Sequence, residues 1–188
     1  MRRLACICLF AGLTLAISFS ATTADDFKLE KGFTLLFNGK NLDGWREAAG
    51  KKTDSLEGKT EAFKGRFKVD DGKLVYDPKV KGDLYIETTK EFGKDVHIKL
   101  DFKPGPACNN DFFIRGTKFD IVPGKGETKA VKEGEWQTLE IIVTGDKIEH
   151  KINGETVRTS KSKTDKATPF KLRAEFGVIE IKNIRAKE

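Results

Sequence analysis

The stretch Trp136–Val157, WQTLEIIVTGDKIEHKINGETV, constrains the fold of this chain more than any other segment. Apolar and polar residues alternate on both sides of the turn at Gly145-Asp146, and the dipeptide Asn153-Gly154 follows. A period of two is typical of β-strands whose two faces meet different surroundings, and Asn-Gly is a strong signal for a two-residue hairpin. The stretch therefore predicts a meander of long antiparallel strands.

The other apolar segments repeat this pattern at short intervals. Further strands are expected at Phe67–Tyr76 (a hairpin around Asp71-Gly72), Asp83–Thr88, Val96–Lys103, Asp111–Arg115, Lys118–Val122, Phe170–Glu175 and Val178–Arg185, and a short one opens Phe33–Trp45. Arg46–Ala62 has no period, and we expect a long loop there. About ten to twelve strands and no helix predict an all-β sandwich or barrel, and the lack of a long repeat argues against a propeller.

The N-terminus has the layout of a signal peptide. Two arginines precede the uncharged apolar run Leu4–Ile17, and small residues follow it. The run is short for a membrane span, so we expect cleavage after Ala24 or Ser20, with an uncleaved anchor as the alternative. The expected organisation is a signal peptide at 1–24 and one domain at 25–188. The mature protein would be secreted or periplasmic, with no membrane span after signal removal.

Cysteine usage and charge exclude several kinds of chemistry. Only Cys108 remains after signal removal, so no intramolecular disulfide is expected, and without a CxxC motif Cys108 is expected to be packed. The chain has 35 basic and 29 acidic residues of interspersed sign, which is unlike the clustered basic surface that binds nucleic acid. With two histidines, a zinc site of the usual composition is not favoured. We therefore predict no nucleic-acid partner, no cofactor and no metal.

Five blocks of the sequence resemble a known family in order and spacing. They are LLFNGKNLDGW, GDLYIETTKEFGKDVHIKLDFK, NNDFFIRG, GEWQTLEIIVTGDKIEHKINGETV and FKLRAEFGVIEIKNI, and they span nearly all of residues 32–188. The family is the 3-keto-disaccharide hydrolase domain family, formerly a domain of unknown function. The resemblance implies a concanavalin A-like jelly roll of two antiparallel sheets, similar to family-16 glycosidases, with a carbohydrate ligand on the concave face.

The chain departs from this family pattern where the family carries acidic residues. The family usually has a GYExQxxD segment, and this chain has GTKFDIVPGKGETKAV instead. Asp120 lies roughly at the family's acidic position, whereas the tyrosine, the glutamine and the second acid are missing. The NSG motif of the family is replaced by Asn109-Asn110-Asp111.

The residues themselves suggest two kinds of sugar chemistry. A glycosidase uses two carboxyl groups about 5–9.5 Å apart. The strand around Asp120 carries no second acid, so such a pair would have to be formed across strands, for example with Glu175. Cleavage of a 3-keto sugar does not require two carboxyl groups, because the ketone acidifies the neighbouring C–H bond. One base could then remove that proton and expel the glycosidic oxygen by elimination. The candidate bases are Asp120 and His150.

Other residues are candidates for binding the substrate. Arg115 and Asn109 could bind a carbonyl or hydroxyl group, and Trp136 could stack on a sugar ring. Each has a structural alternative: an ion pair for Arg115, a turn for Asn109 and a core or loop anchor for Trp136. In the same way, His150 could be packed beside its apolar neighbours, and Glu175 could be an exposed strand charge.

Three functions are therefore open from the sequence. The first is a hydrolase or lyase that acts on glycosidic bonds of 3-keto disaccharides or glycosides. The second is a carbohydrate-binding module without catalysis, and the third is a structural surface domain that uses the sandwich as a scaffold. A pocket with Asp120 and a second titratable group would favour the first, whereas a shallow groove with aromatic and amide groups would favour the second.

Overall fold

The computed structural model of the chain describes residues 27–48 and 53–188. The expected signal peptide and its cleavage positions lie outside the described residues. In the part of the chain that is described, none of the helical structure is long or apolar enough to cross a membrane.

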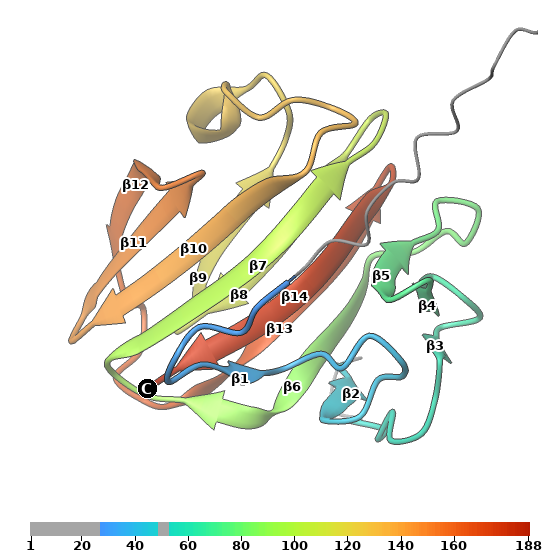
Figure 1. Ribbon diagram of the computed structural model, residues 1–188, viewed down its shortest axis with the longest axis horizontal. Helices are drawn as coiled ribbons and strands as arrows, with labels where there is room; N and C mark the ends of the chain where they lie inside the picture. Colours follow the sequence, from blue (N-terminus) through green and yellow to red (C-terminus); the bar gives the residue numbers. More distant parts are fainter. Residues whose placement is uncertain (1–26, 49–52) are drawn as a thin grey trace, which may run out of the picture.

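Fourteen β-strands are found in the described residues, and they form two antiparallel sheets that pack face to face (Figure 1). The larger sheet has nine strands in the order β12-β11-β10-β7-β14-β5-β4-β3, with β1 beside β14, and the smaller sheet has five in the order β2-β6-β13-β8-β9. The strands are β1 (Thr34–Leu35), β2 (Trp45–Glu47), β3 (Glu61–Ala62), β4 (Phe67–Asp70), β5 (Lys73–Tyr76), β6 (Leu84–Phe92), β7 (Val96–Pro104), β8 (Asn109–Ile114), β9 (Thr117–Ile121), β10 (Gln137–Thr144), β11 (Lys147–Ile152), β12 (Glu155–Lys161), β13 (Thr168–Phe176) and β14 (Ile179–Lys187), and a single 3₁₀ turn, η1, spans Gly126–Thr128.

The core lies between the two sheets and follows from the alternation in the sequence. Along β7 every second side chain, from Val96 to Phe102, is buried, and the side chains between them face outward. The five-stranded sheet supplies the opposing layer, with Phe112 and Leu172 on its inner face. Each such apolar side chain contributes roughly 1.5–3 kcal/mol when it is fully buried.

The structure confirms the predicted meander and the predicted hairpins. Strands β10, β11 and β12 pair in sequence order, and β10 also pairs with β7. Both Asp71-Gly72 and Asn153-Gly154 have positive φ angles at their two central positions, as the type I′ hairpin turn requires. The predicted all-β jelly-roll sandwich of two antiparallel sheets is therefore confirmed.

The prediction of one long loop at Arg46–Ala62 was wrong in part. Strand β2 extends into it, Arg46 forms a bridge with Ser55, and β3 lies at its end. Leu56 is fully buried and anchors the segment to the core. These strands are only two or three residues long, too short to show a period in sequence, which is also why the observed number of strands exceeds the expected one.

Candidate functional site

A row of polar side chains crosses the outer face of the five-stranded sheet. Tyr85 on β6 is paired with Arg173 on β13, Arg173 with Asp111 on β8, and Asp111 with Asp120 on β9. Side chains alternate between the two faces of a strand, so this row faces away from the core to which Phe112 contributes. Strand β6, strand β13 and the β8–β9 hairpin are separated in sequence, and their pairing places these polar groups side by side.

The two aspartates in this row differ sharply in their surroundings. The side chain of Asp111 is 0% exposed, whereas that of Asp120 is 34% exposed. Burial and the neighbouring Asp120 carboxylate raise the pKa of Asp111 to about 7. The pKa of Asp120 is lowered, because hydrogen bonding to Asp111 and Lys118 outweighs the effect of burial. Below about pH 7 the pair therefore shares one proton, with Asp111 as its holder and Asp120 ionised.

Two cations hold this pair in place. Arg173 Nη1 lies 2.6 Å from Asp111 Oδ2 and 2.9 Å from Glu175 Oε2, and its other nitrogens bind both carboxylate oxygens of Asp83. Lys118 Nζ lies 2.5 Å from Asp120 Oδ1 and 3.9 Å from Asp111 Oδ1. Asp111 Oδ1 accepts no hydrogen bond from any described residue, as expected for the oxygen that carries the shared proton.

A second row runs parallel to the first across the same face. Glu87 on β6 is 5% exposed and is contacted by Arg46 at 2.8 Å and by Lys171 at 3.1 Å. Phe113 on β8 is paired with Lys171 and packs its ring 6.1 Å from that of Tyr85. These aromatic rings help to line a pocket of about 330 Å³. The row therefore offers an apolar wall beside ion-paired charges, a combination that suits a sugar ring.

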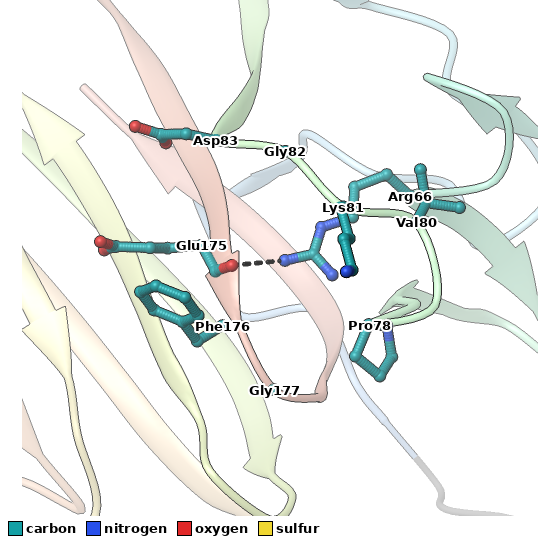
Figure 2. A pocket seen from close by; sticks show the side chains of 9 residues that line it. All are labelled: Arg66, Pro78, Val80, Lys81, Gly82, Asp83, Glu175, Phe176 and Gly177. Atoms are coloured by element: carbon teal, nitrogen blue, oxygen red, sulfur yellow. Dashed lines mark hydrogen bonds between the residues drawn. The ribbon is translucent and has the colours of Figure 1, made fainter.

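A larger pocket of about 470 Å³ borders the first row on the side opposite the second row, where Asp83 and Glu175 help to line it (Figure 2). Its rim is set by the end of β13, where Asn110 accepts a hydrogen bond from the Glu175 backbone N–H and donates one to the Phe176 carbonyl oxygen, both 2.9 Å long. The next residue, Gly177, has φ +67°, and a Cβ there would lie 2.5 Å from backbone atoms of Ala107. The pocket rim is thus fixed by one amide side chain and one obligatory glycine.

Two of the predicted catalytic residues lie on the same face of the same sheet. Asp120 belongs to the first row, and Glu175 lies beyond it on β13, in contact with Arg173. Arg173 and Asp111 stand between the two carboxylates, so the structure brings them to one surface without direct contact. Asn109 begins β8 opposite Phe176 and is half-buried at the edge of this surface.

The third predicted catalytic residue, His150, lies between the sheets. It is 1% exposed, its ring stacks on Phe119 with centroids 4.4 Å apart, and its Nδ1 has no hydrogen-bond partner within the described ranges. Burial lowers its pKa to about 3. Phe119 and Asp120 are neighbours on β9 and point to opposite faces, so the sheet separates His150 from the polar rows.

The remaining predicted binding residues are placed away from Asp120. Arg115 is buried in the β8–β9 turn, where its guanidinium group donates to Ser162 Oγ and to the Asp165 carbonyl oxygen and so secures the crossing segment. Trp136 is 38% exposed on the nine-stranded sheet, with Lys103 Nζ 5.3 Å from the centroid of its ring. For all six predicted residues, the functional role stays a prediction.

Several residues of the site were missed by the sequence reasoning. They are Tyr85, Asp111 and Arg173 in the first row and Glu87, Lys171 and Lys118 in the second, where Lys118 is paired with Phe113. A signal was present, since Lys171, Arg173 and Glu175 alternate with Phe170, Leu172 and Ala174 in FKLRAEF. What the sequence could not supply was the register that aligns this strand with β8 and β6.

Within residues 27–48 and 53–188, no three His, Cys, Asp or Glu side chains are grouped so as to hold a metal ion. Cys108 is buried, which raises the pKa of its thiol to about 11, and it has the packed position expected from the sequence.

The fold is similar to that of several solved jelly-roll sandwiches. A candidate glycosyl hydrolase from Parabacteroides distasonis ATCC 8503 is 19% identical, with a TM-score of 0.61 over 83% of this chain and 93% of that one. The carbohydrate-binding module CBM66 from Bacillus subtilis is 12% identical, with a TM-score of 0.51 over 77% and 96% of the two chains. The β-glucanase of Bacillus licheniformis is 12% identical, with a TM-score of 0.52 over 83% and 97%.

The sequence identifies the family itself. The family described as the 3-keto-alpha-glucoside-1,2-lyase-like domain matches residues 32–130 and 120–187, and the chain belongs to it. The resemblance seen in the sequence blocks is thereby confirmed. No curated protein matches the chain.

Proposed function

We propose that this protein cleaves the glycosidic bond of 3-keto glucosides on the outer face of the five-stranded sheet. The observation that carries the proposal is the proton-sharing pair of Asp111 and Asp120, held between Arg173 and Lys118. The family description and the sandwich fold support a carbohydrate substrate. The N-terminal sequence supports export, and we propose that the protein works outside the cytoplasm.

The reaction would be an elimination, which needs one base and one group that stabilises an oxyanion. The ketone at C3 acidifies the hydrogen on C2. Removal of that proton forms the C1–C2 double bond as the C1–O bond breaks, and the departing oxygen takes up a proton. The products are a free alcohol and an unsaturated keto sugar, and addition of water to the double bond would give net hydrolysis.

Each residue of the pair has a different part in this proposal. Asp120 is partly exposed and ionised, so it can take the C2 proton and return it to the departing oxygen. Lys118, with a side chain 43% exposed, can face the developing negative charge on the C3 oxygen. Asp111 is buried and does not reach the substrate, and it is therefore a positioning residue that sets the protonation of Asp120.

The direct contact within the pair argues against the usual glycosidase arrangement. A retaining or inverting enzyme separates its two carboxyl groups by about 5–9.5 Å, with the sugar or a water molecule between them. Asp111 and Asp120 face each other across adjacent strands and share a proton. An unmodified glycoside should therefore be a poor substrate compared with its 3-keto form.

Incubation of the protein with matched 3-keto and unmodified glucosides, followed by mass spectrometry, tests the proposal. Loss of a general base slows a reaction by about 10²–10⁴-fold, so Asp120→Asn should abolish most turnover of the keto substrate. The control is Asp70→Asn, which makes the same change at an exposed position on β4 and should leave turnover intact. Equal turnover by wild type and Asp120→Asn would refute the role of Asp120.

Carbohydrate binding without catalysis is the second candidate function. It is favoured by the 2.5 Å contact between Lys118 and Asp120, because a paired carboxylate with a lowered pKa accepts sugar hydroxyl hydrogen bonds well but is a weak base. Saturable saccharide binding without turnover of either glucoside would establish this function in place of cleavage.

A further inference from the structure

The pocket at the end of β13 is lined by two cationic side chains, Arg66 and Lys81, that form no close ion pair with any described carboxylate. It is formed by Arg66 at the start of β4, by the loop before β6 and by the end of β13 (Figure 2). Two of its lining residues, Asp83 and Glu175, also contact Arg173 of the first polar row. The pocket therefore borders the first row at Arg173, on the same face of the sheet as the pair proposed for sugar cleavage.

Arg66 is a buried cation that forms no close ion pair within the described residues and is attracted by the Asp77 carboxylate only at longer range. It is 2% exposed, and its guanidinium group donates to the backbone carbonyl oxygens of Asp77 at 2.8 Å and Glu175 at 2.9 Å. No described carboxylate forms an ion pair with it, and its Nε has no hydrogen-bond partner among the described residues. Burial lowers the pKa of Arg66, which reflects the unfavourable free energy of a desolvated charge.

The other charged side chains of the pocket do not form an ion pair with Arg66. Both acidic residues of the lining are engaged by Arg173, which binds Asp83 through two nitrogens and Glu175 through one. Lys81 is exposed at the mouth and forms no ion pair with any described residue. Lys81 and Arg66 lie on the same side of the pocket in Figure 2.

The rest of the lining suits a ring rather than a free ion. Phe176 is 60% exposed at the rim, and Pro78 and Val80 form an apolar wall across the pocket from it (Figure 2). The volume of about 470 Å³ is enough for one sugar unit. An exposed aromatic ring next to polar groups is a common platform for the apolar face of a pyranose.

We propose that this pocket binds an acidic sugar unit, with its carboxylate facing Arg66 and Lys81 and its ring against Phe176. The inference rests on the proposed function, because the pocket adjoins the row that would cleave the glycosidic bond. The natural ligand would then be a negatively charged saccharide with a uronic acid unit in this pocket.

Binding of methyl glucuronide, methyl glucoside and inorganic sulfate, measured by calorimetry at one fixed ionic strength, tests the inference. A charge-assisted hydrogen bond in a partly buried site favours the glucuronide by about tenfold over the neutral sugar. Lys81→Glu should abolish this preference, and Lys40→Glu is the matched control at an exposed lysine outside the pocket. Phe176→Ala alters an exposed side chain. It should lower the affinity for both sugars and leave the ratio of the two affinities unchanged.

The outcomes separate this inference from the proposed function. A glucuronide preference that disappears in Lys81→Glu and persists in Lys40→Glu supports the inference, even if no keto glucoside is cleaved. Equal affinity for glucuronide and glucoside overturns it, even if keto glucosides are cleaved by the Asp120-dependent route. Sulfate that binds as tightly as glucuronide, with no effect of Phe176→Ala, also overturns it, because the pocket would then be a site for small free anions.

Discussion

Because Asp111 holds a proton in the folded protein, we predict that its contribution to the free energy of unfolding falls as the pH rises. Its pKa is raised from 3.8 to about 7 in the folded state. Between these values the folded protein keeps a proton that the unfolded chain has released, so the free energy of unfolding falls with increasing pH. One pK unit corresponds to about 1.36 kcal/mol, and a shift of about three units therefore gives roughly 4 kcal/mol. This contribution is fully present below about pH 4 and is lost as the pH rises through 7.

The substitution Asp111→Asn isolates this contribution. An amide matches the neutral acid in size, can donate to Asp120 and can accept a hydrogen bond from Arg173, but it does not titrate. His150 has the opposite slope, since its pKa is lowered to about 3 and its neutral form gains stability up to about pH 6.5. The difference between variant and wild type cancels the His150 contribution.

Urea unfolding followed by tryptophan fluorescence at pH 5, 6, 7 and 8 measures this difference, because the ring of Trp45 is fully buried. We expect the variant to gain stability relative to wild type by roughly 1 kcal/mol for each pH unit up to 7. Asp70→Asn, at an exposed acid, should show no such trend. A constant difference between Asp111→Asn and wild type across this range would refute the shared proton.

Three further predictions concern His150, Gly177 and Cys108. His150→Leu replaces a ring that must stay neutral in the core. The change in the free energy of unfolding that it causes should therefore be more favourable at pH 5 than at pH 7 by roughly 2 kcal/mol in urea titrations. An equal change at both pH values would contradict the neutral buried histidine. Gly177→Ala forces a Cβ against the Ala107 backbone at positive φ and should cost about 2–4 kcal/mol in the same assay, with unchanged stability as the contradicting result. Cys108 should resist thiol reagents at pH 8 in the folded protein and react once urea unfolds it, whereas rapid labelling of the native protein would show that the thiol is not buried.

The fold was largely predictable because alternating apolar residues and turn dipeptides can be recognised within short segments of the sequence. The alternation along Val96–Lys103 and Trp136–Val157 fixes strands with one buried face, and Asn153-Gly154 fixes a hairpin. The short strands β1, β2 and β3 were harder to place, since two or three residues cannot show a period. They are ordered by their contacts with longer neighbours, such as β14 and β6.

The candidate site was predictable only in part because it depends on register. Asp120 was found through the family pattern, but its partner Asp111 was recorded only as a departure from that pattern. The two are 9 positions apart in sequence and are joined by the hairpin turn at Arg115-Gly116, which sets them opposite each other. Arg173 reaches them only through the pairing of β13 with β8, which no local signal specifies.

The position of His150 on its strand also shows what could not be predicted from local sequence. The sequence placed it on the face shared by Ile148 and Ile152, and the structure has it on that face. Whether that face was the core or a ligand groove depended on which sheet packs against it. Phe119, from the other sheet, covers the His150 ring.

The central claim is that saccharides bind the outer face of the five-stranded sheet, and amide chemical-shift mapping tests it most directly. Isotope-labelled Asp120→Asn protein, which should bind but not cleave, would be titrated with a methyl 3-keto glucoside. We predict that the shifts cluster on β8, β9 and β13, around Asp111, Lys118 and Arg173. Shifts that cluster instead around Trp136 on the nine-stranded sheet would contradict the claim.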